Sequence, residues 1–429
     1  MPATSVALTP GLASFLKSLK TNPIDTSIDN LISLLKRRQI RHSRSCATAT
    51  AYLLLRVISA CRTTDAAKLI ERVQSVGRRL IAAQPKEMVV GNIVRRVLGL
   101  IRDEAEDDRE ADFNLSEASE SQPQTPRATD DPSDAMSFRH EGSRSMPAPI
   151  SMFSLLSHPE PEPSLPGTPA SVSPSGRLLG HHTPSKDIRA EVLDGIGEII
   201  DELGQVDDQI AAYALDHIHS NEIILTHTSS TTVQRFLLKA AAKRKFTVIH
   251  AESYPNNHEA THATVSGNVP KDDELLSTES FQKPLIELGI TVILIPDSAV
   301  FALMSRVNKV ILGTHSVLAN GGLVAAAGTR VIARAAKVHQ TPVVVVSGVY
   351  KLSPVYPFDF DSLIEYGDAS KVIPYEDGDL VDQIDVQNPI YDYVPAELID
   401  LYITNLGGHA PSYLYRIVSD HYRREDINV

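Results

Sequence analysis

The stretch Ser305–Thr329, SRVNKVILGTHSVLANGGLVAAAGT, decides the fold of this chain. An apolar run at residues 310–312 is typical of a buried strand, and Asn320-Gly321-Gly322 follows after a loop. We expect this glycine sequence to open a helix of small residues. In an open parallel sheet, ligands bind in the crevice beyond the carboxyl ends of the strands. The loop between the strand and Asn320 is therefore a candidate site.

Length and composition narrow the class of protein. At 429 residues the chain is long enough for two domains, each with its own core. The net charge of −12 argues against a nucleic-acid surface, because phosphate binding needs excess Lys and Arg. The two cysteines, Cys46 and Cys61, form no disulfide framework and suit a reducing compartment. Since no signal-peptide pattern and no apolar run of about 20 residues occurs, we expect a cytoplasmic protein without DNA or membrane partners.

Residues 1–102 form the first predicted domain, which is all-α. Apolar residues recur at helical spacing over 24–35 and 69–81, and a further helix is expected from Pro85. Asn22 is a suitable N-cap for a helix with Pro23 at its first position. Four arginines are expected to be solvated at a helix end: Arg37, Arg38, Arg41 and Arg44.

Residues 103–185 are predicted to be a disordered insertion. The segment 103–112 holds seven acidic residues and one arginine, and residues 113–185 contain twelve of the 27 prolines. A segment with so few apolar residues cannot bury enough surface to offset its chain entropy.

A helical connection over 186–220 completes the first domain, with a bend or break expected at Gly195, Gly197 or Gly204. Residues 221–429 then alternate apolar strands with helices, which predicts a Rossmann-like, doubly wound parallel sheet. The expected strands are Glu222–Thr226, Phe246–Ala251, Thr291–Pro296, Lys309–Gly313 and Pro342–Ser347. The expected helices between them are Thr232–Lys243, Ser298–Val307 and Leu323–His339.

Motifs for metal and nucleotide chemistry are weak. His258–His262 matches HExxH, but its surroundings are those of a polar loop rather than a long amphipathic helix, so we expect no zinc. The phosphate-binding loops GxxxxGK[ST] and GxGxxG are missing from the expected places. We therefore predict no cofactor, no metal and no hydrolysis of GTP or ATP.

Several segments together resemble the regulatory-subunit family of eukaryotic translation initiation factor 2B. Ser220-Asn221-Glu222 and Arg244-Lys245-Phe246 favour the beta branch of that family over its alpha and delta members. The resemblance covers essentially all of residues 187–429. The segments that carry it are Glu222–His227, Ser305–Gly322, Lys351–Pro354, Tyr391–Ile399 and Asn405–Arg416.

The same family is similar to isomerases of the methylthioribose-1-phosphate type, in which a cysteine and an aspartate move a proton between sugar carbons. Here Thr228 and His315 stand at those two positions, and Ala325-Ala326 replaces an Asn-Lys pair that helps to hold the substrate. A threonine hydroxyl is a poor acid or base near neutral pH, whereas a histidine is able to act as a base. We interpret the region as a relic pocket rather than a catalytic site. Its predicted residues are Thr228, His315, Asn320, Gly321 and Gly322.

The resemblance implies a non-catalytic regulatory subunit of a guanine-nucleotide exchange factor. Its partners would be a delta subunit in a direct heterodimer, then alpha, gamma and epsilon subunits, and initiation factor 2, especially the alpha subunit of that factor. It places a subunit interface near Asn221, Ile223 and Thr247. Tyr413 and Tyr415 are further candidates, since aromatic residues often anchor interfaces. A sugar-phosphate isomerase and the delta subunit itself are the alternatives.

Deletion of residues 113–185 is expected to leave assembly with the partner subunits intact, because a solvated tether contributes little to packing. Copurification of the shortened chain with its partners measures this. Loss of the complex would contradict the prediction.

Overall fold

The computed structural model of the protein describes residues 11–61, 63, 65–120, 187–253, 276–356, 359–373 and 383–429. The chain divides into two units, one of residues 1–111 and 187–429 and one of residues 112–186. All of the side chains that the structure describes belong to the first unit. The HExxH motif at 258–262 lies outside the described residues.

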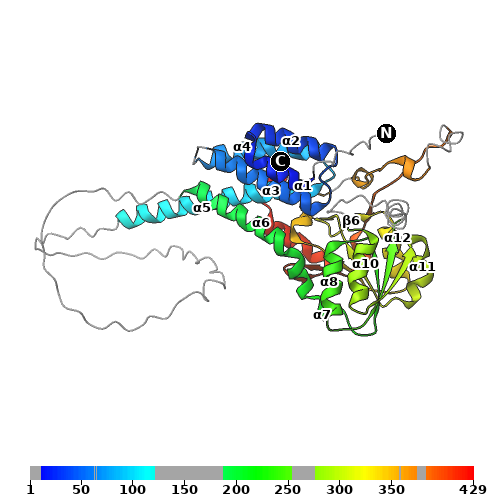
Figure 1. The fold of residues 1–429 in the computed structure, drawn as a ribbon. Helices are drawn as coiled ribbons and strands as arrows, with labels where there is room; N and C mark the ends of the chain where they lie inside the picture. Colours follow the sequence, from blue (N-terminus) through cyan, green and yellow to red (C-terminus); the bar gives the residue numbers. More distant parts are fainter. Residues whose placement is uncertain are drawn as a thin grey trace, which may run out of the picture. The chain divides into compact units, whose positions relative to one another are not determined.

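The helical region consists of long amphipathic helices. They are α1 (Leu12–Thr21), α2 (Ile24–Lys36), α3 (Ser43–Ala60), α4 (Ala66–Ala83), α5 (Met88–Glu120), α6 (Ile188–Ala212) and the short α7 (Ala214–His217). In Figure 1, α3 lies along α6, and α2 packs on α4. The side chains of Asp65 and Asp187 cap α4 and α6 by accepting hydrogen bonds from backbone N–H groups in the first turn.

Helix boundaries differ from the sequence prediction in three places. Asn22 is the C-cap of α1 rather than the N-cap of α2, and Pro23 takes the N-cap position. α6 continues through its glycines without a break. Gly195 lies against Leu100 of α5, since an added Cβ would lie 3.2 Å from the leucine Cδ1. α5 continues to Glu120, so the predicted start of the insertion at residue 103 lies inside a helix.

The main sheet has seven strands in the order β11-β10-β7-β4-β1-β2-β3. All neighbours are parallel except β11, which is antiparallel to β10. The strands are β1 (Ile223–His227), β2 (Thr247–Glu252), β3 (Thr291–Pro296), β4 (Lys309–Gly313), β7 (Val343–Val346), β10 (Leu401–Thr404) and β11 (Gly407–His409). The α-helices around them are α8 (Thr231–Ala241), α10 (Thr278–Glu287), α11 (Val300–Leu303), α12 (Thr329–Val338) and α13 (Leu414–His421).

Both faces of this sheet are covered, as the apolar strands predicted. Successive strand residues point to opposite faces, so Ile224 and Val248 join one hydrophobic cluster while Leu225 and Ile249 join another. Figure 1 shows α8 and α10 on one side of the strands and α11 and α12 on the other. The helical region and a Rossmann-like doubly wound sheet are thus confirmed.

One core joins the helical region to the sheet. Buried Leu31, Leu54 and Val97 of the helices belong to the same cluster as Ile224 and Val248 of the strands. The boundary at residue 220 therefore separates a helical region from a sheet region, but the two regions share one hydrophobic core.

A second, four-stranded sheet was not predicted. Its order is β8-β5-β6-β9, with strands β5 (Ser316–Leu318), β6 (Leu323–Ala326), β8 (Leu352–Ser353) and β9 (Tyr391–Val394). The predicted helix Leu323–His339 was wrong in its first part, because residues 323–326 form β6 and α12 begins only at Thr329. The predicted helix Ser298–Val307 has a single α-turn, α11, between two 3₁₀ turns.

Short 3₁₀ turns complete the described structure. They are η2 (Asp297–Ala299), η3 (Met304–Arg306), η4 (Val349–Lys351), η5 (Asp361–Leu363), η6 (Ala369–Lys371), η9 (Ala396–Leu398), η10 (Pro411–Tyr413) and η11 (Arg424–Asp426).

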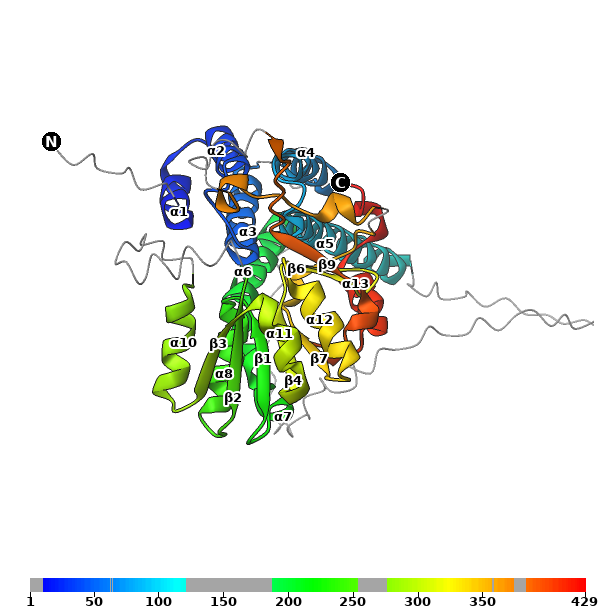
Figure 2. The same cartoon turned by 90° about the vertical axis from the view of Figure 1, so that its right-hand side faces the viewer.

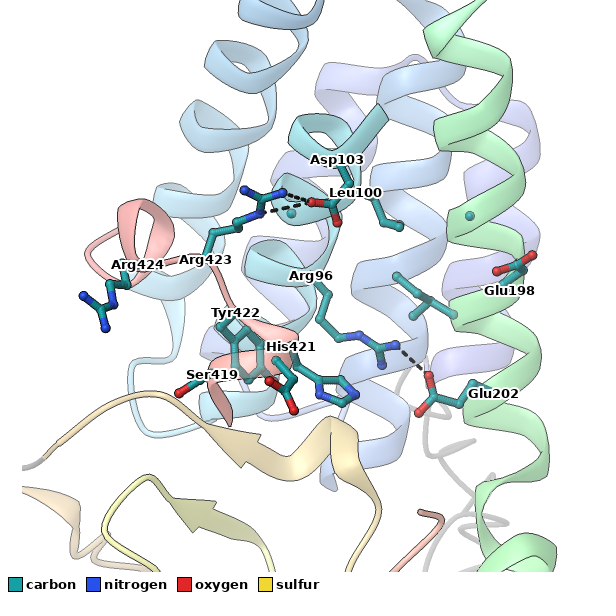
Figure 3. A pocket seen from close by; sticks show the side chains of 14 residues that line it. Arg96, Leu100, Asp103, Glu198, Glu202, Ser419, His421, Tyr422, Arg423 and Arg424 are labelled. Atoms are coloured by element: carbon teal, nitrogen blue, oxygen red, sulfur yellow. Dashed lines mark hydrogen bonds and ion pairs between the residues drawn. The ribbon is translucent and has the colours of Figure 1, made fainter. Parts of the chain in front are cut away.

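The C-terminal segment is held on α5 by paired charges. Arg102 donates two hydrogen bonds, of 3.0 and 2.9 Å, to the fully buried carboxylate of Asp426. Arg95 donates to the carbonyl oxygen of Ile427. Arg423 pairs with Asp103 and Glu106, acidic residues that the sequence placed in the insertion. In Figure 3, Arg423 reaches from the segment after α13 to Asp103 on α5.

Removing the buried carboxylate of this pair is expected to destabilise the fold. Asp426→Ala leaves Arg102 without its main partner, so the free energy of unfolding should fall by about 3 kcal/mol. Urea denaturation measures the change. Asp420→Ala, which removes an exposed carboxylate from the end of α13, is the matched control and should shift it by less than about 0.5 kcal/mol. Equal effects of the two substitutions would contradict the role given to the pair.

Candidate functional site

The relic-pocket residues Thr228 and His315 lie at one edge of the main sheet. Each follows the carboxyl end of a strand, and those strands, β1 and β4, are neighbours in the sheet. Thr228 has a left-handed backbone (φ 58°), and its N–H donates to the carbonyl of Ala251 at the end of β2. The carboxyl edge therefore has the geometry of a ligand crevice.

Side chains of the helical region and of β9 pack against His315. The hydroxyl of Ser43, at the start of α3, donates to the backbone carbonyl of His315 (2.9 Å) and lies 3.2 Å from its Nδ1. Glu87, just before α5, places Oε2 3.5 Å from Nε2. The ring of Tyr391 stacks on the imidazole, with centroids 4.3 Å apart. The histidine is thus enclosed by residues of three distant segments.

The contact between Glu87 and His315 is between neutral groups. Burial raises the pKa of Glu87 to about 8, against the opposing charges of Lys351 and Arg38. Burial, assisted by the charge of Lys351, lowers the pKa of His315 to about 3. At pH 7 the carboxyl keeps its proton and the imidazole takes none up. The desolvation free energy of two buried charges exceeds their Coulomb attraction here, so the neutral pair is favoured.

A second polar cluster lies at the start of α8, the helix that follows β1. Arg44 of α3 forms an ion pair with the buried Asp207 of α6, and the hydroxyl of Thr232 donates to the same carboxylate at 2.8 Å. Lys351 donates to the carbonyl of Thr314 at 2.8 Å, and burial lowers the pKa of this lysine. The cations near the crevice therefore have carboxylate or carbonyl partners within the chain.

Arg44 was predicted to be solvated, and the structure corrects this, since it pairs with Asp207 and also donates to the carbonyl of Gly204. Arg38 likewise forms an ion pair with the buried Glu365. These arginines join α2 and α3 to distant segments because their partners, 163 to 327 residues further along the chain, return to the helical region only in the fold.

The N-terminus of α12 is also occupied by a residue of the chain. The carboxylate of Asp392 accepts hydrogen bonds from the N–H groups of Gly328 (2.7 Å) and Arg330 (3.2 Å). A helix N-terminus favours an anion, and here the anion is an aspartate from β9.

Asn320, Gly321 and Gly322 form a hairpin turn rather than a helix start. Gly321 has a positive φ of 79°, and the N–H of Gly322 donates to the side chain of Asn320 at 2.9 Å. The loop between β5 and β6 has four residues, 319–322, with Gly321 in the left-handed conformation. The Asn320 amide donates to the hydroxyl of Tyr393 on β9, and the hydroxyl of Tyr402 on β10 of the main sheet donates to the carbonyl of Gly321. The turn is thus hydrogen-bonded to both sheets.

The predicted interface residues lie in two places. Ile223 and Thr247 are register partners at the amino ends of β1 and β2, beside the exposed Asn221. Tyr413 and Tyr415 are exposed near β11, the opposite edge of the sheet from β3.

Two pockets occur among the described residues that border the helical region. One, of about 750 Å³, lies between α5, α6 and α13 (Figure 3). Two of its three lining arginines, Arg96 and Arg423, form ion pairs with Glu202 and Asp103. The other, of about 700 Å³, opens beside Tyr391. We assign no ligand to this second pocket.

The described residues contain no group of three or more His, Cys, Asp or Glu side chains placed to hold a metal ion. Within the same part of the chain, none of the helices is both long enough and apolar enough to span a membrane.

Sequence reasoning missed the residues that close the site. Ser43 and Glu87 carry no local signal, because their partner His315 is more than 200 residues away. Asp392 lay within a segment quoted for the family resemblance, but its role depends on the pairing of β6 with β9.

The fold is a Rossmann-like, doubly wound domain joined to a helical region, and side chains of the chain itself fill its carboxyl edge. A family model described as the Initiation factor 2 subunit family matches residues 39–271 and 276–411. The chain belongs to this family.

The relatives place it near the beta branch, as the sequence motifs indicated. The chain is 42% identical over 405 residues to translation initiation factor eIF2B subunit beta of Schizosaccharomyces pombe, covering 93% of this chain and 96% of that protein. It is similar to the eIF2B beta2-delta2 tetramer structure from C. thermophilum (33% identity, TM-score 0.63, 96% and 100% coverage). Ribose 1,5-bisphosphate isomerase of Archaeoglobus fulgidus is 31% identical over 233 residues, covering 54% of this chain and 68% of the enzyme.

The buried carboxyl of Glu87 predicts a pH dependence of stability. Its pKa is about 8 in the folded state and 4.5 as the ordinary value, so the folded state binds the extra proton between these values. The free energy of unfolding should therefore fall as pH rises in this range. His315 has the opposite effect, but only between about pH 3 and 6.5.

Glu87→Gln mimics the protonated carboxyl, so the variant should lack the fall in the free energy of unfolding that the titration of Glu87 causes. Between pH 6.5 and 7.5 the wild type should lose about 1 kcal/mol relative to the variant. Burial also lowers the pKa of Lys351, so this lysine contributes to the pH dependence of stability as well. Comparison with the variant isolates the contribution of Glu87. Denaturation curves at several pH values measure the difference, with the exposed Glu198→Gln as control. Parallel pH profiles for wild type and Glu87→Gln would contradict the prediction.

Proposed function

We propose that this chain is a regulatory subunit of the guanine-nucleotide exchange factor for initiation factor 2, with no catalytic site of its own. The observation that carries the proposal is the enclosure of His315 by Ser43, Glu87 and Tyr391. A substrate that reached this histidine would have to displace all three side chains.

The residue types at the positions of the isomerase catalytic groups also support a non-catalytic subunit. An isomerase needs an acid and a base whose pKa values suit proton transfer near neutral pH. Thr228 offers only a hydroxyl. Burial keeps the imidazole of His315 neutral, and the neighbouring side chains enclose it. Ala325 and Ala326, at the positions of the substrate-holding pair, are strand residues of β6 that pair with β9. Asp207 and Asp392 occupy places where a phosphate would be attracted.

The partners follow from the relatives. The similar solved structure is a tetramer of beta and delta subunits, which supports a delta subunit as the direct partner. By the family resemblance, alpha, gamma and epsilon subunits complete the assembly. We propose that the chain scaffolds this assembly in the cytosol, and that its helical region helps to bind initiation factor 2 alpha and to sense the phosphorylation of that subunit.

The delta subunit is less well supported as an identity, because the beta relative matches 93% of the chain at 42% identity. The isomerase alternative rests on the archaeal enzyme, which matches only 54% of the chain.

Reconstitution with the other four subunits tests the proposed role. Nucleotide exchange on initiation factor 2 should be slower without this chain, and inhibition by the phosphorylated factor should be weaker. Exchange rates are measured with and without the chain at equal concentrations of the other subunits. Unchanged rates and unchanged inhibition would contradict the proposal.

An isomerase assay separates the main alternative. We expect no turnover of ribose 1,5-bisphosphate or methylthioribose-1-phosphate above the buffer blank, with the archaeal isomerase as positive control. Turnover that disappears in His315→Ala would overturn the non-catalytic reading, since it would place the histidine in the reaction.

A further inference from the structure

The pocket of about 750 Å³ between α5, α6 and α13 has the dimensions of a small-molecule site. Such sites usually measure about 300–1,000 Å³. This α5–α6 cavity has one wall from each of these two helices, and residues 419–424 form the third wall. In Figure 2 the C-terminal residues, drawn in red, run from α13 past α5. Neither Thr228 nor His315 lines the cavity, so it is separate from the relic pocket.

The α5 wall of the cavity faces open space at Gly99. This glycine is buried, yet a Cβ added to it would meet no other side chain and no neighbouring element within 4 Å. Packed interiors seldom leave such a position empty. Leu100 of α5, Ile199 of α6 and the buried Tyr422 add apolar surface to the three walls. The cavity thus offers room and apolar contacts to a ligand.

Charged side chains of the cavity walls are largely paired within the chain. Arg96 of α5 donates to the carboxylate of Glu202 on α6 at 2.7 Å, and Arg423 forms an ion pair with Asp103. The remaining carboxylates and guanidinium among the lining residues are exposed: Glu198, Asp420 and Arg424. A charged ligand would lose its hydration without meeting a free opposite charge inside. The cavity therefore favours an uncharged ligand.

One hydrogen-bond donor of the cavity lacks a partner. Nη1 of Arg96 is buried, and it has no acceptor among the residues that the structure describes. Figure 3 shows the guanidinium of Arg96 extending from α5 to Glu202 on α6, with His421 and Tyr422 on the third wall. A buried donor without an acceptor costs free energy, which a ligand with an acceptor would recover.

We propose that the α5–α6 cavity binds a small uncharged organic molecule. Its carbonyl or comparable acceptor receives a hydrogen bond from Nη1 of Arg96, and its apolar ring packs against Leu100, Ile199 and Tyr422. The bound molecule contacts α5, α6 and the C-terminal segment together, so it stabilises their packing. The proposed regulatory role neither requires nor excludes this site.

Two probes of matched shape test the ligand class on the full-length chain. Acetophenone carries a carbonyl beside its aromatic ring, whereas ethylbenzene has no acceptor. Arg96→Lys keeps a cation for Glu202 but lacks the second guanidinium nitrogen. The ratio of the ethylbenzene Kd to the acetophenone Kd should therefore be about fivefold lower in this variant than in the wild type. Calorimetric titration measures the Kd values, and saturating acetophenone should raise the midpoint of thermal unfolding of the wild type.

Filling the cavity tests the location. Gly99→Phe places a ring in the open space and should raise the Kd of both probes about tenfold or more. Gly197→Phe is the matched control, because an added Cβ there also meets nothing within 4 Å and Gly197 does not line the cavity. Thermal unfolding without ligand checks that each variant keeps the fold.

Each result supports or overturns the assignment. If the wild type binds neither probe, or if Gly99→Phe binds both as tightly as Gly197→Phe does, the cavity is not a ligand site. If the ratio of Kd values is the same in Arg96→Lys and in the wild type, Arg96 does not donate to the ligand and the proposed ligand class is wrong. Failure of the nucleotide-exchange prediction would overturn the regulatory role and leave these binding results unchanged.

Discussion

The rest of the structure depends on the contact between the helical region and the carboxyl edge of the main sheet. There, Ser43 and Glu87 meet His315 beneath the ring of Tyr391, in an interior where charge is costly. Glu87 and His315 remain neutral instead of forming an ion pair, and Ser43 hydrogen-bonds to the histidine. Because the same helices contribute to the core on one face of the sheet, this polar contact and the apolar core hold the two regions in one arrangement.

The same contact fills the part of the sheet where related folds bind ligands. In an open parallel sheet, the carboxyl edge is where a ligand would bind. Here that edge is occupied by residues of the chain itself: a serine and a glutamate beside His315, Asp207 at α8 and Asp392 at α12. Exposed apolar side chains lie on other elements, such as Phe301 on α11 and Tyr415 on α13.

The sequence supported the main architecture because its signals were local. Apolar runs such as 291–296 and 309–313 match β3 and β4 residue for residue. It failed where a short segment had two interpretations. Asn320-Gly321-Gly322 was interpreted as a helix start, although Asn-Gly sequences are also strong hairpin signals, and the turn joins β5 to β6. Likewise, the acidic residues near 103 indicated disorder, whereas in the structure Asp103 and Glu106 form ion pairs with Arg423.

By itself, the sequence determined the alternation of strands and helices and the family. Those features depend on neighbours in the chain or on residue identity alone. Only the tertiary structure decided that Ser43 and Glu87 lie against His315. Burial and charge state depend on segments hundreds of residues apart, and the packed core is what brings those segments together.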